Sequence, residues 1–296
     1  MDIEKIKFLT ALTLVVCFLL LPLGSLGLSF FYELGSKLKK KVLLDKLAQQ
    51  IARQGLIFGL GVGISLAILS FWPGFGVKVN MDFLSSPLWT QGLIFLGASL
   101  LLTISYFALW KSLKNIKVLH LLLGIGAIVF YKLFLFNFFR VSYNLLLVSN
   151  TNYPPLNSIF YPVVGQLFIL SFLFSTSMAF IFLILRRKID DFGRDYYRYA
   201  LHVLSKSGIL VLVLSIIPCL VVFYLLQERF VFAPLIQPGA VIILAMLFHF
   251  FVFYWLLKQN QPLRYKGLIS LLPLGSMVLL FFRLVSYFEL FKMAGH

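Results

Sequence analysis

Long apolar stretches separated by short polar connections dominate the chain. A helix that crosses the roughly 30 Å hydrocarbon layer of a bilayer needs about 20 residues. Eight stretches reach that length, near residues 8–34, 54–72, 89–110, 118–139, 160–185, 207–226, 239–257 and 267–291. The pattern predicts an all-α, polytopic transmembrane helix bundle of about eight spans. No connection is long enough for a soluble domain, so we expect one integral membrane domain over residues 1–296.

The composition is typical of a membrane protein, and it argues against nucleic-acid binding as the reason for the high positive charge. Hydrophobic residues make up 61% of the chain and charged residues only 12%, and the mean hydropathy is +0.98. A soluble domain does not have this balance. The net charge of +16 would suggest nucleic acid for a soluble protein, but here the basic residues lie in short loops between spans. Lipid is therefore the expected partner, and nucleic acid is not.

The distribution of Lys and Arg predicts the orientation of the spans. Loops that carry an excess of these residues remain in the cytoplasm. Residues 35–53, 111–117, 186–206 and 258–266 form the basic loops, whereas the alternate loops carry Lys78, Arg140 and Arg229 alone. The pattern predicts a bacterial inner-membrane protein with both termini outside. The cytoplasmic set is Lys37, Lys39, Lys40, Lys41, Lys46 and Arg53, then Lys111, Lys114 and Lys117, then Arg186, Arg187, Lys188, Arg194, Arg198 and Lys206, then Lys258, Arg264 and Lys266.

Small and polar residues recur at helical spacing inside several spans. Gly55-x-x-x-Gly59-x-x-x-Gly63 is a ridge that lets a second helix backbone approach closely, so it indicates helix packing. Polar side chains are costly at lipid depth, so polar stripes should face the bundle interior, where they form inter-helix hydrogen bonds. The stripes are Thr10, Thr13 and Cys17 in the first span, Ser99, Thr103 and Tyr106 in the third, and Ser276, Arg283 and Tyr287 in the last.

Two cations stand inside the spans. Lys132 and Arg283 both fall in the outer half of the bilayer by the predicted orientation, with Arg140 just beyond. Together they could form a basic site for haem propionates, a quinone carbonyl or a lipid phosphate. The alternative is that both side chains extend separately to the outer interface. Glu289 is a candidate ion-pair partner for either.

Three histidines are candidate cofactor ligands. His120 and His202 lie at the predicted cytoplasmic ends of the fourth and sixth spans, where two facing helices could present them to one b-type haem. His249 lies near the middle of the seventh span among phenylalanines. The alternative for all three is a structural hydrogen bond.

The sequence shows no other catalytic or metal-binding constellation. It has no Cys-x-x-Cys-His, no His-Glu-x-x-His and no paired carboxylates within the membrane, and nearly all acidic residues fall in loops. Asp190, Asp191 and Asp195 lie among basic residues, which is typical of a solvated, salt-bridged turn. No catalytic residue is therefore assigned.

The opening of the chain resembles a known family. Thr10-Ala11-Leu12-Thr13, Pro22-Leu23, Gly27-Leu28 and the stretch 47–53 are similar to the first part of the large subunit of cytochrome bd-type quinol oxidases and of shorter oxidase-like membrane cytochromes. The resemblance covers roughly the first 70 residues. In two places the sequence departs from it. Cys17 stands where that family has a haem-ligating histidine, and only residues 227–238 remain of its external quinol loop.

The resemblance implies an integral membrane subunit of a respiratory electron-transfer complex with reduced or lost haem content. Haem b and quinone are the cofactors that it implies, and cytochromes or iron–sulfur proteins are the partners. An accessory subunit without its own catalytic cycle is expected. The alternative is a transporter, or a structural subunit of a membrane transport complex, although no inverted repeat is found.

The predicted orientation is tested by cysteine accessibility. Cysteines introduced as Lys40→Cys and Asp190→Cys, in a chain without Cys17 and Cys219, should resist an impermeant thiol reagent added outside intact cells. Both should react after the cells are opened. Labelling of either position from outside would contradict the orientation.

Overall fold

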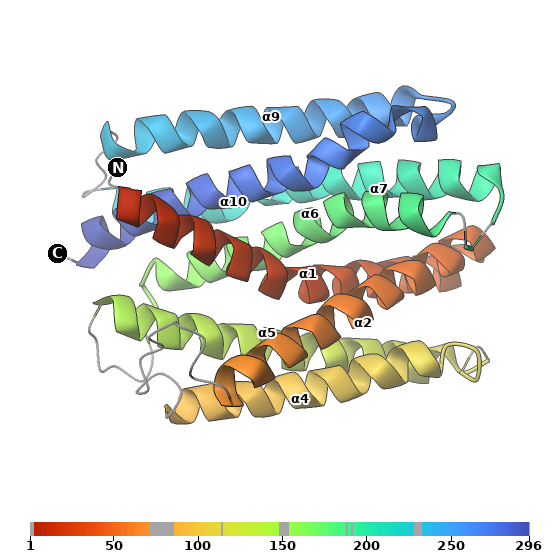
Figure 1. The fold of residues 1–296 in the computed structure, drawn as a ribbon, viewed down its shortest axis with the longest axis horizontal. Coiled ribbons are helices and arrows are strands. Elements are labelled where there is room, and N and C mark those ends of the chain that lie inside the picture. The colour runs from red at the N-terminus through yellow and green to blue at the C-terminus, as the bar shows by residue number, and fades with distance from the viewer. Residues whose placement is uncertain are drawn as a thin grey trace. The chain divides into compact units, whose positions relative to one another are not determined.

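The computed structural model describes residues 3–71, 86–113, 115–147, 154–187, 189–190, 192–227 and 233–295. Every regular element in these residues is a helix (Figure 1). Eight helical segments are long and apolar enough to cross a membrane, so the predicted multi-pass helical bundle is confirmed. The elements are α1 Ile3–Lys39, α2 Val42–Phe71, α4 Pro87–Ala108, α5 Lys117–Leu147, α6 Phe160–Arg186, α7 Arg194–Leu214, α8 Ile216–Leu226, η1 Ala233–Leu235, α9 Ile236–Lys258, η2 Pro262–Tyr265 and α10 Lys266–Gly295.

Some of the residues used in the sequence analysis lie outside the described residues. The orientation of the bundle, including both termini, stays a prediction. The residues concerned are Lys78, Lys114, Lys188, Asp191, Arg229 and His296.

The chain divides into two compact units. Unit 1 comprises Met1–Leu20 and Leu156–His296, and unit 2 comprises Leu21–Pro155. The chain passes from one to the other within α1, next to Pro22. The expected single membrane domain stays a prediction.

Unit 2 contains the second half of α1 together with α2, α4 and α5. In Figure 1, α4 and α5 lie side by side, and Ser99 of α4 donates a hydrogen bond to the Ala127 carbonyl of α5 at 2.8 Å. The glycine ridge of α2 packs as predicted. A Cβ added at Gly55 would lie 3.1 Å from Ser25 Cβ, and one at Gly63 would lie 2.8 Å from a Leu100 methyl. The ridge therefore serves close packing of α2 against α1 and α4.

Unit 1 is built from α6, α7, α8, α9 and α10 with the start of α1. The tightest approach is between α7 and α9, where a Cβ added at Gly208 would lie 2.4 Å from the buried Phe253 ring. Phe253 stacks in turn on Phe180 of α6 with ring centroids 5.9 Å apart. These aromatic and glycine contacts join α6, α7 and α9 through apolar groups.

The polar stripes behave in two ways. Ser99 and Tyr106 of α4 form inter-helix hydrogen bonds as predicted, as do Ser276 and Tyr287 of α10, with Ser276 2.9 Å from Ser177 of α6. Thr103 of α4 instead donates to the Ser99 carbonyl of its own helix. The stripe of α1 differs, because Thr10 and Thr13 donate to the carbonyls of Ile6 and Leu9 in their own helix. A Thr hydroxyl can donate its hydrogen bond to the backbone carbonyl four residues earlier in the same helix. Helical spacing alone does not reveal which of the two occurs.

Candidate functional site

Unit 2 contains a buried carboxylate near the end of α1. Glu33 of α1 is only 2% exposed. Its Oε2 accepts a hydrogen bond from the Tyr106 hydroxyl of α4 at 2.7 Å, and its Oε1 lies 2.6 Å from Nδ1 of His120 on α5. A buried carboxyl group is tolerated when such partners compensate its lost hydration. This site was not predicted from the sequence, because nearly all the acidic residues fall in loops and Glu33 was grouped with them.

A signal for Glu33 was present in the sequence. Glu33 is the one acidic residue within the predicted first span, residues 8–34. An ionisable residue within a span suggests a functional site by default. Its position at the end of the apolar stretch made it look like the start of the following basic loop.

Both ring nitrogens of His120 are engaged. Nε2 lies 2.7 Å from the backbone carbonyl oxygen of Tyr106, and Nδ1 faces Glu33. The ring also stacks on Tyr106 with centroids 4.4 Å apart and meets Trp110 edge-on at 4.7 Å. The imidazole is therefore fixed in both its plane and its direction.

The geometry of this contact allows Glu33 and His120 to share one proton. A carbonyl oxygen can only accept, so Nε2 of His120 must carry a hydrogen. The 2.6 Å contact between Nδ1 and Glu33 Oε1 then contains a second hydrogen, on the nitrogen as imidazolium or on the oxygen as carboxylic acid. Either state satisfies all partners, so the proton can move between the two atoms without rearranging the helices.

The hydrogen-bond chain continues beyond Glu33. The Tyr106 hydroxyl lies 3.2 Å from Ser29 Oγ, and Ser29 donates to the Ala48 carbonyl of α2 at 2.8 Å. The chain of polar groups thus runs from His120 through Glu33, Tyr106 and Ser29. It connects α5, α1, α4 and α2.

A cavity of about 170 Å³ reaches this pair, and we call it the Glu33 cavity. Each water molecule occupies roughly 30 Å³ in the liquid, so the cavity is large enough for a few of them. At its outer part Lys117 and Asp45 form an ion pair at 2.8 Å, and both are about one quarter exposed. The cavity therefore extends from the buried pair to partly exposed charges in the loops predicted to be cytoplasmic. Its lining residues are Glu33, Asp45, Gln49, Trp110, Lys111, Leu113, Lys117 and His120.

The other two candidate histidines form structural hydrogen bonds. His202 is half-buried, and its Nε2 lies 3.1 Å from the Gln259 carbonyl at the end of α9. His249 is fully buried; its Nδ1 lies 2.7 Å from the Ala245 carbonyl, and its Nε2 lies 2.9 Å from Ser276 Oγ. These contacts correspond to the alternative stated for the histidines above.

The intramembrane cations lie in different units. Lys132 is an exposed residue of α5 in unit 2. Arg283 of α10 in unit 1 contacts sulfur atoms, at 3.2 Å to Cys219 Sγ and 3.5 Å to Met246 Sδ. A site shared by Lys132 and Arg283 stays a prediction.

Haem ligation by His120 or His249 would replace a hydrogen bond that each makes in this structure. Iron binds a histidine through a ring-nitrogen lone pair. In His120 and His249 both nitrogens lie within hydrogen-bond distance of protein groups. Among the described residues, no group of three or more His, Cys, Asp or Glu side chains is suited to a metal ion. Ligation by His120 and His202, which belong to different units, stays a prediction.

The comparisons with known proteins support the fold. No family model and no curated protein sequence matches the chain. Among solved structures, the chain is similar to one described as "The structure of bd oxidase from Geobacillus thermodenitrificans", with a TM-score of 0.63 and 14% sequence identity. The match covers 98% of this chain and 86% of that chain. At this identity the likeness shows the fold alone.

The protein is thus a multi-pass helical membrane protein with a bd-oxidase-like fold. Cys17 is buried in α1. Its equivalence to a ligand histidine stays a prediction.

The Glu33–His120 pair should show strong energetic coupling. His120→Phe leaves a buried carboxyl group without its main partner, so it should lower the free energy of unfolding by about 3–5 kcal/mol. The double variant Glu33→Leu with His120→Phe removes both polar groups and should recover at least half of that loss. Unfolding in mixed micelles measures both values.

His202→Phe is the matched control, because His202 is half-buried and has one contact at 3.1 Å to a carbonyl. His202→Phe should lower the free energy of unfolding by no more than about 1 kcal/mol. A double variant as unstable as His120→Phe alone would show that the two residues are not coupled.

Proposed function

We propose that this chain is an integral membrane subunit of a respiratory electron-transfer complex and that it conducts protons toward its partner subunits. The observation that carries the proposal is the Glu33–His120 pair, whose facing atoms lie 2.6 Å apart and which lines a cavity. The bd-oxidase-like fold supports the respiratory setting. Reduction chemistry at a membrane consumes protons, so a proton-holding group inside the bundle suits such a complex.

The proton enters from the side predicted to be cytoplasmic. Asp45 and Lys117 mark the outer part of the Glu33 cavity, and water in the cavity would pass the proton inward. Glu33 and His120 hold it, because both protonation states of the pair are hydrogen-bonded. Tyr106 and Ser29 extend the chain of exchangeable hydrogens beyond the pair.

The redox chemistry belongs to the partners in this proposal. Cytochromes or iron–sulfur proteins would supply the electron carriers, and the chain would anchor them in the inner membrane. Haem b or quinone would bind at or between subunits, with His120, His202, His249, Lys132 and Arg283 as the candidate contacts within this chain.

A transporter is the second candidate, and the same pair is the observation that favours it. Intramembrane carboxylate and histidine groups form the proton relays of many transporters. A proton that moves between Glu33 and the cytoplasm could be coupled to solute movement as well as to electron transfer. The two functions differ in their partners and in whether the chain works alone.

Purification and turnover of the complex test the proposal. The tagged chain, extracted in mild detergent, should bring down subunits that carry haem or iron–sulfur absorption. Glu33→Gln keeps the size of the side chain but holds no transferable proton, so it should lower donor-driven turnover of the complex by at least about tenfold.

Glu4→Gln is the matched control, since Glu4 is an exposed carboxylate of the same helix that pairs with Lys7 at 3.0 Å. It should leave turnover unchanged, and both variants should retain their partners. A monodisperse chain without partners that accumulates a solute in liposomes under a proton gradient would favour the transporter.

A further inference from the structure

Unit 1 contains a cavity of about 450 Å³ with strongly basic walls, which we call the basic cavity. Three segments supply its cations, namely the residue after α6, the first turns of α7, and η2 with the start of α10. Among the residues that the structure describes, neither Asp nor Glu lines it. The cations are Arg187, Arg194, Arg198, Arg264 and Lys266.

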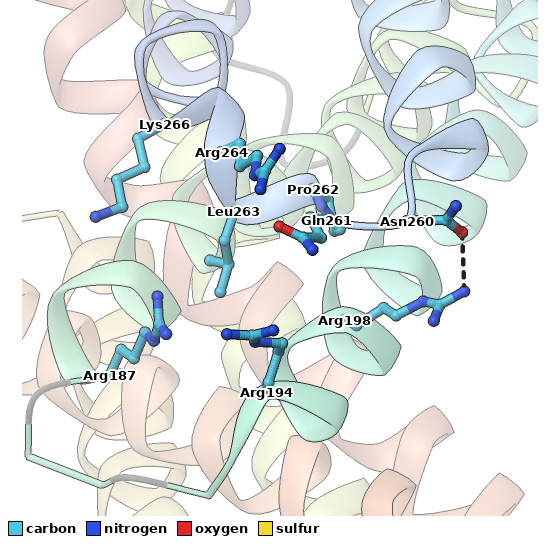
Figure 2. Close-up of a pocket in the computed structure, with 9 residues that line it drawn as sticks. All are labelled: Arg187, Arg194, Arg198, Asn260, Gln261, Pro262, Leu263, Arg264 and Lys266. Carbon is cyan, nitrogen blue, oxygen red and sulfur yellow. Dashed lines mark hydrogen bonds between the residues drawn. The ribbon is translucent and has the colours of Figure 1, made fainter.

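The cations surround one space. Figure 2 shows Arg187 and Arg194 on one wall, and Arg264 on the opposite wall formed by η2. Arg198 donates to the Oδ1 of Asn260 at 3.2 Å, which leaves the side-chain NH₂ group of Asn260 as a further donor. The basic cavity thus offers guanidinium and amide donors from opposite sides.

The nearby acidic groups that the structure describes form no ion pair with these cations. Asp190 is held by Arg186 through two hydrogen bonds of 2.5 and 2.7 Å, and Arg186 does not line the cavity. Within the part of the chain that the structure describes, no cation of the basic cavity forms an ion pair. Arg194 and Arg198 are one helical turn apart, so their like charges repel. An anion in the cavity would remove that cost.

The start of α7 adds a second attraction for an anion. Arg194 is the first residue of α7 and lines the cavity, and the N-cap residue is Gly193, which makes no side-chain cap hydrogen bond. The first backbone N–H groups of a helix carry a partial positive charge and favour anions. The helix N-terminus and the side-chain cations therefore both attract an anion into the basic cavity.

We propose that the basic cavity binds a phosphate-bearing anion. The planar guanidinium group matches phosphate oxygens with two parallel hydrogen bonds, and such bonds are stronger than neutral ones. The volume of the basic cavity lies in the range of small-molecule sites, so it takes a phosphate together with what is attached to it. Pro262 and Leu263 supply an apolar wall for that attached part.

This phosphate group can come from two sources. The basic cavity lies at the helix ends predicted to be cytoplasmic, where basic pockets recognise anionic lipid headgroups. A soluble organic phosphate or pyrophosphate from the cytoplasm presents the same chemistry. The site is independent of the proton pathway proposed for unit 2.

The test uses the full chain in phosphatidylcholine nanodiscs and two probes, phosphatidylglycerol mixed into the bilayer and inorganic pyrophosphate in solution. A probe that binds the folded chain raises its thermal unfolding midpoint. Arg194→Gln with Arg264→Gln removes one cation from each wall. It should weaken the apparent affinity for the effective probe by at least about tenfold. Without probe its midpoint should stay within a few degrees of that of the unmodified chain.

Lys37→Gln with Lys39→Gln is the control, because it removes the same charge from exposed residues of unit 2. It should keep the response of the unmodified chain. A rise with phosphatidylglycerol alone identifies a lipid headgroup, and a rise with pyrophosphate identifies a soluble phosphate. No rise with either probe, or an equal rise in both double variants, would overturn the proposal.

Discussion

A carboxyl group inside a membrane-spanning bundle has to be compensated where it lies, and this constraint organises unit 2. The Tyr106 hydroxyl of α4 and the His120 imidazole of α5 both lie within 2.7 Å of the Glu33 carboxyl oxygens. Each partner is itself oriented, His120 by the Tyr106 carbonyl and Tyr106 by Ser29. The registers of the helices are therefore fixed by one polar centre. A shift of any helix by one residue would leave a buried polar group unsatisfied, at a cost of about 1–3 kcal/mol.

In unit 1, buried polar groups are also compensated by hydrogen bonds, but no carboxylate takes part among the described residues. His249 lies between the Ala245 carbonyl and the Ser276 hydroxyl, and Tyr287 donates to Gln166 at 2.7 Å. Among the described residues neither network contains a carboxylate, although Arg283 joins Gln166 through Cys219. A buried network of this kind specifies packing, but it lacks a carboxyl–imidazole pair between which a proton could move. The difference explains why we assign proton handling to unit 2 and the binding of an anion to the helix ends of unit 1.

The spans were predictable from the sequence, whereas the centre of unit 2 was not. Apolar length determines a span because the backbone satisfies its hydrogen bonds in lipid as a helix, and about 20 apolar residues of helix cross the hydrocarbon layer. Small-residue spacing predicted the ridge at Gly55 and Gly63 correctly. The contact between Glu33 and His120 joins residues 87 positions apart, and spacing along one helix carries no information about such a pair. Likewise the basic loops predicted an orientation. Their convergence on one cavity depends on how α7 packs against η2.

The central claim is that Glu33 and His120 share one exchangeable proton, and infrared spectroscopy of the purified chain tests it directly. The carboxyl band that Glu33→Gln removes should shift in D₂O, and His120→Phe should change its frequency because it removes the imidazole that shares the proton. Glu4→Gln should leave this band intact. A Glu33 band that neither exchanges in D₂O nor changes in His120→Phe would contradict the account.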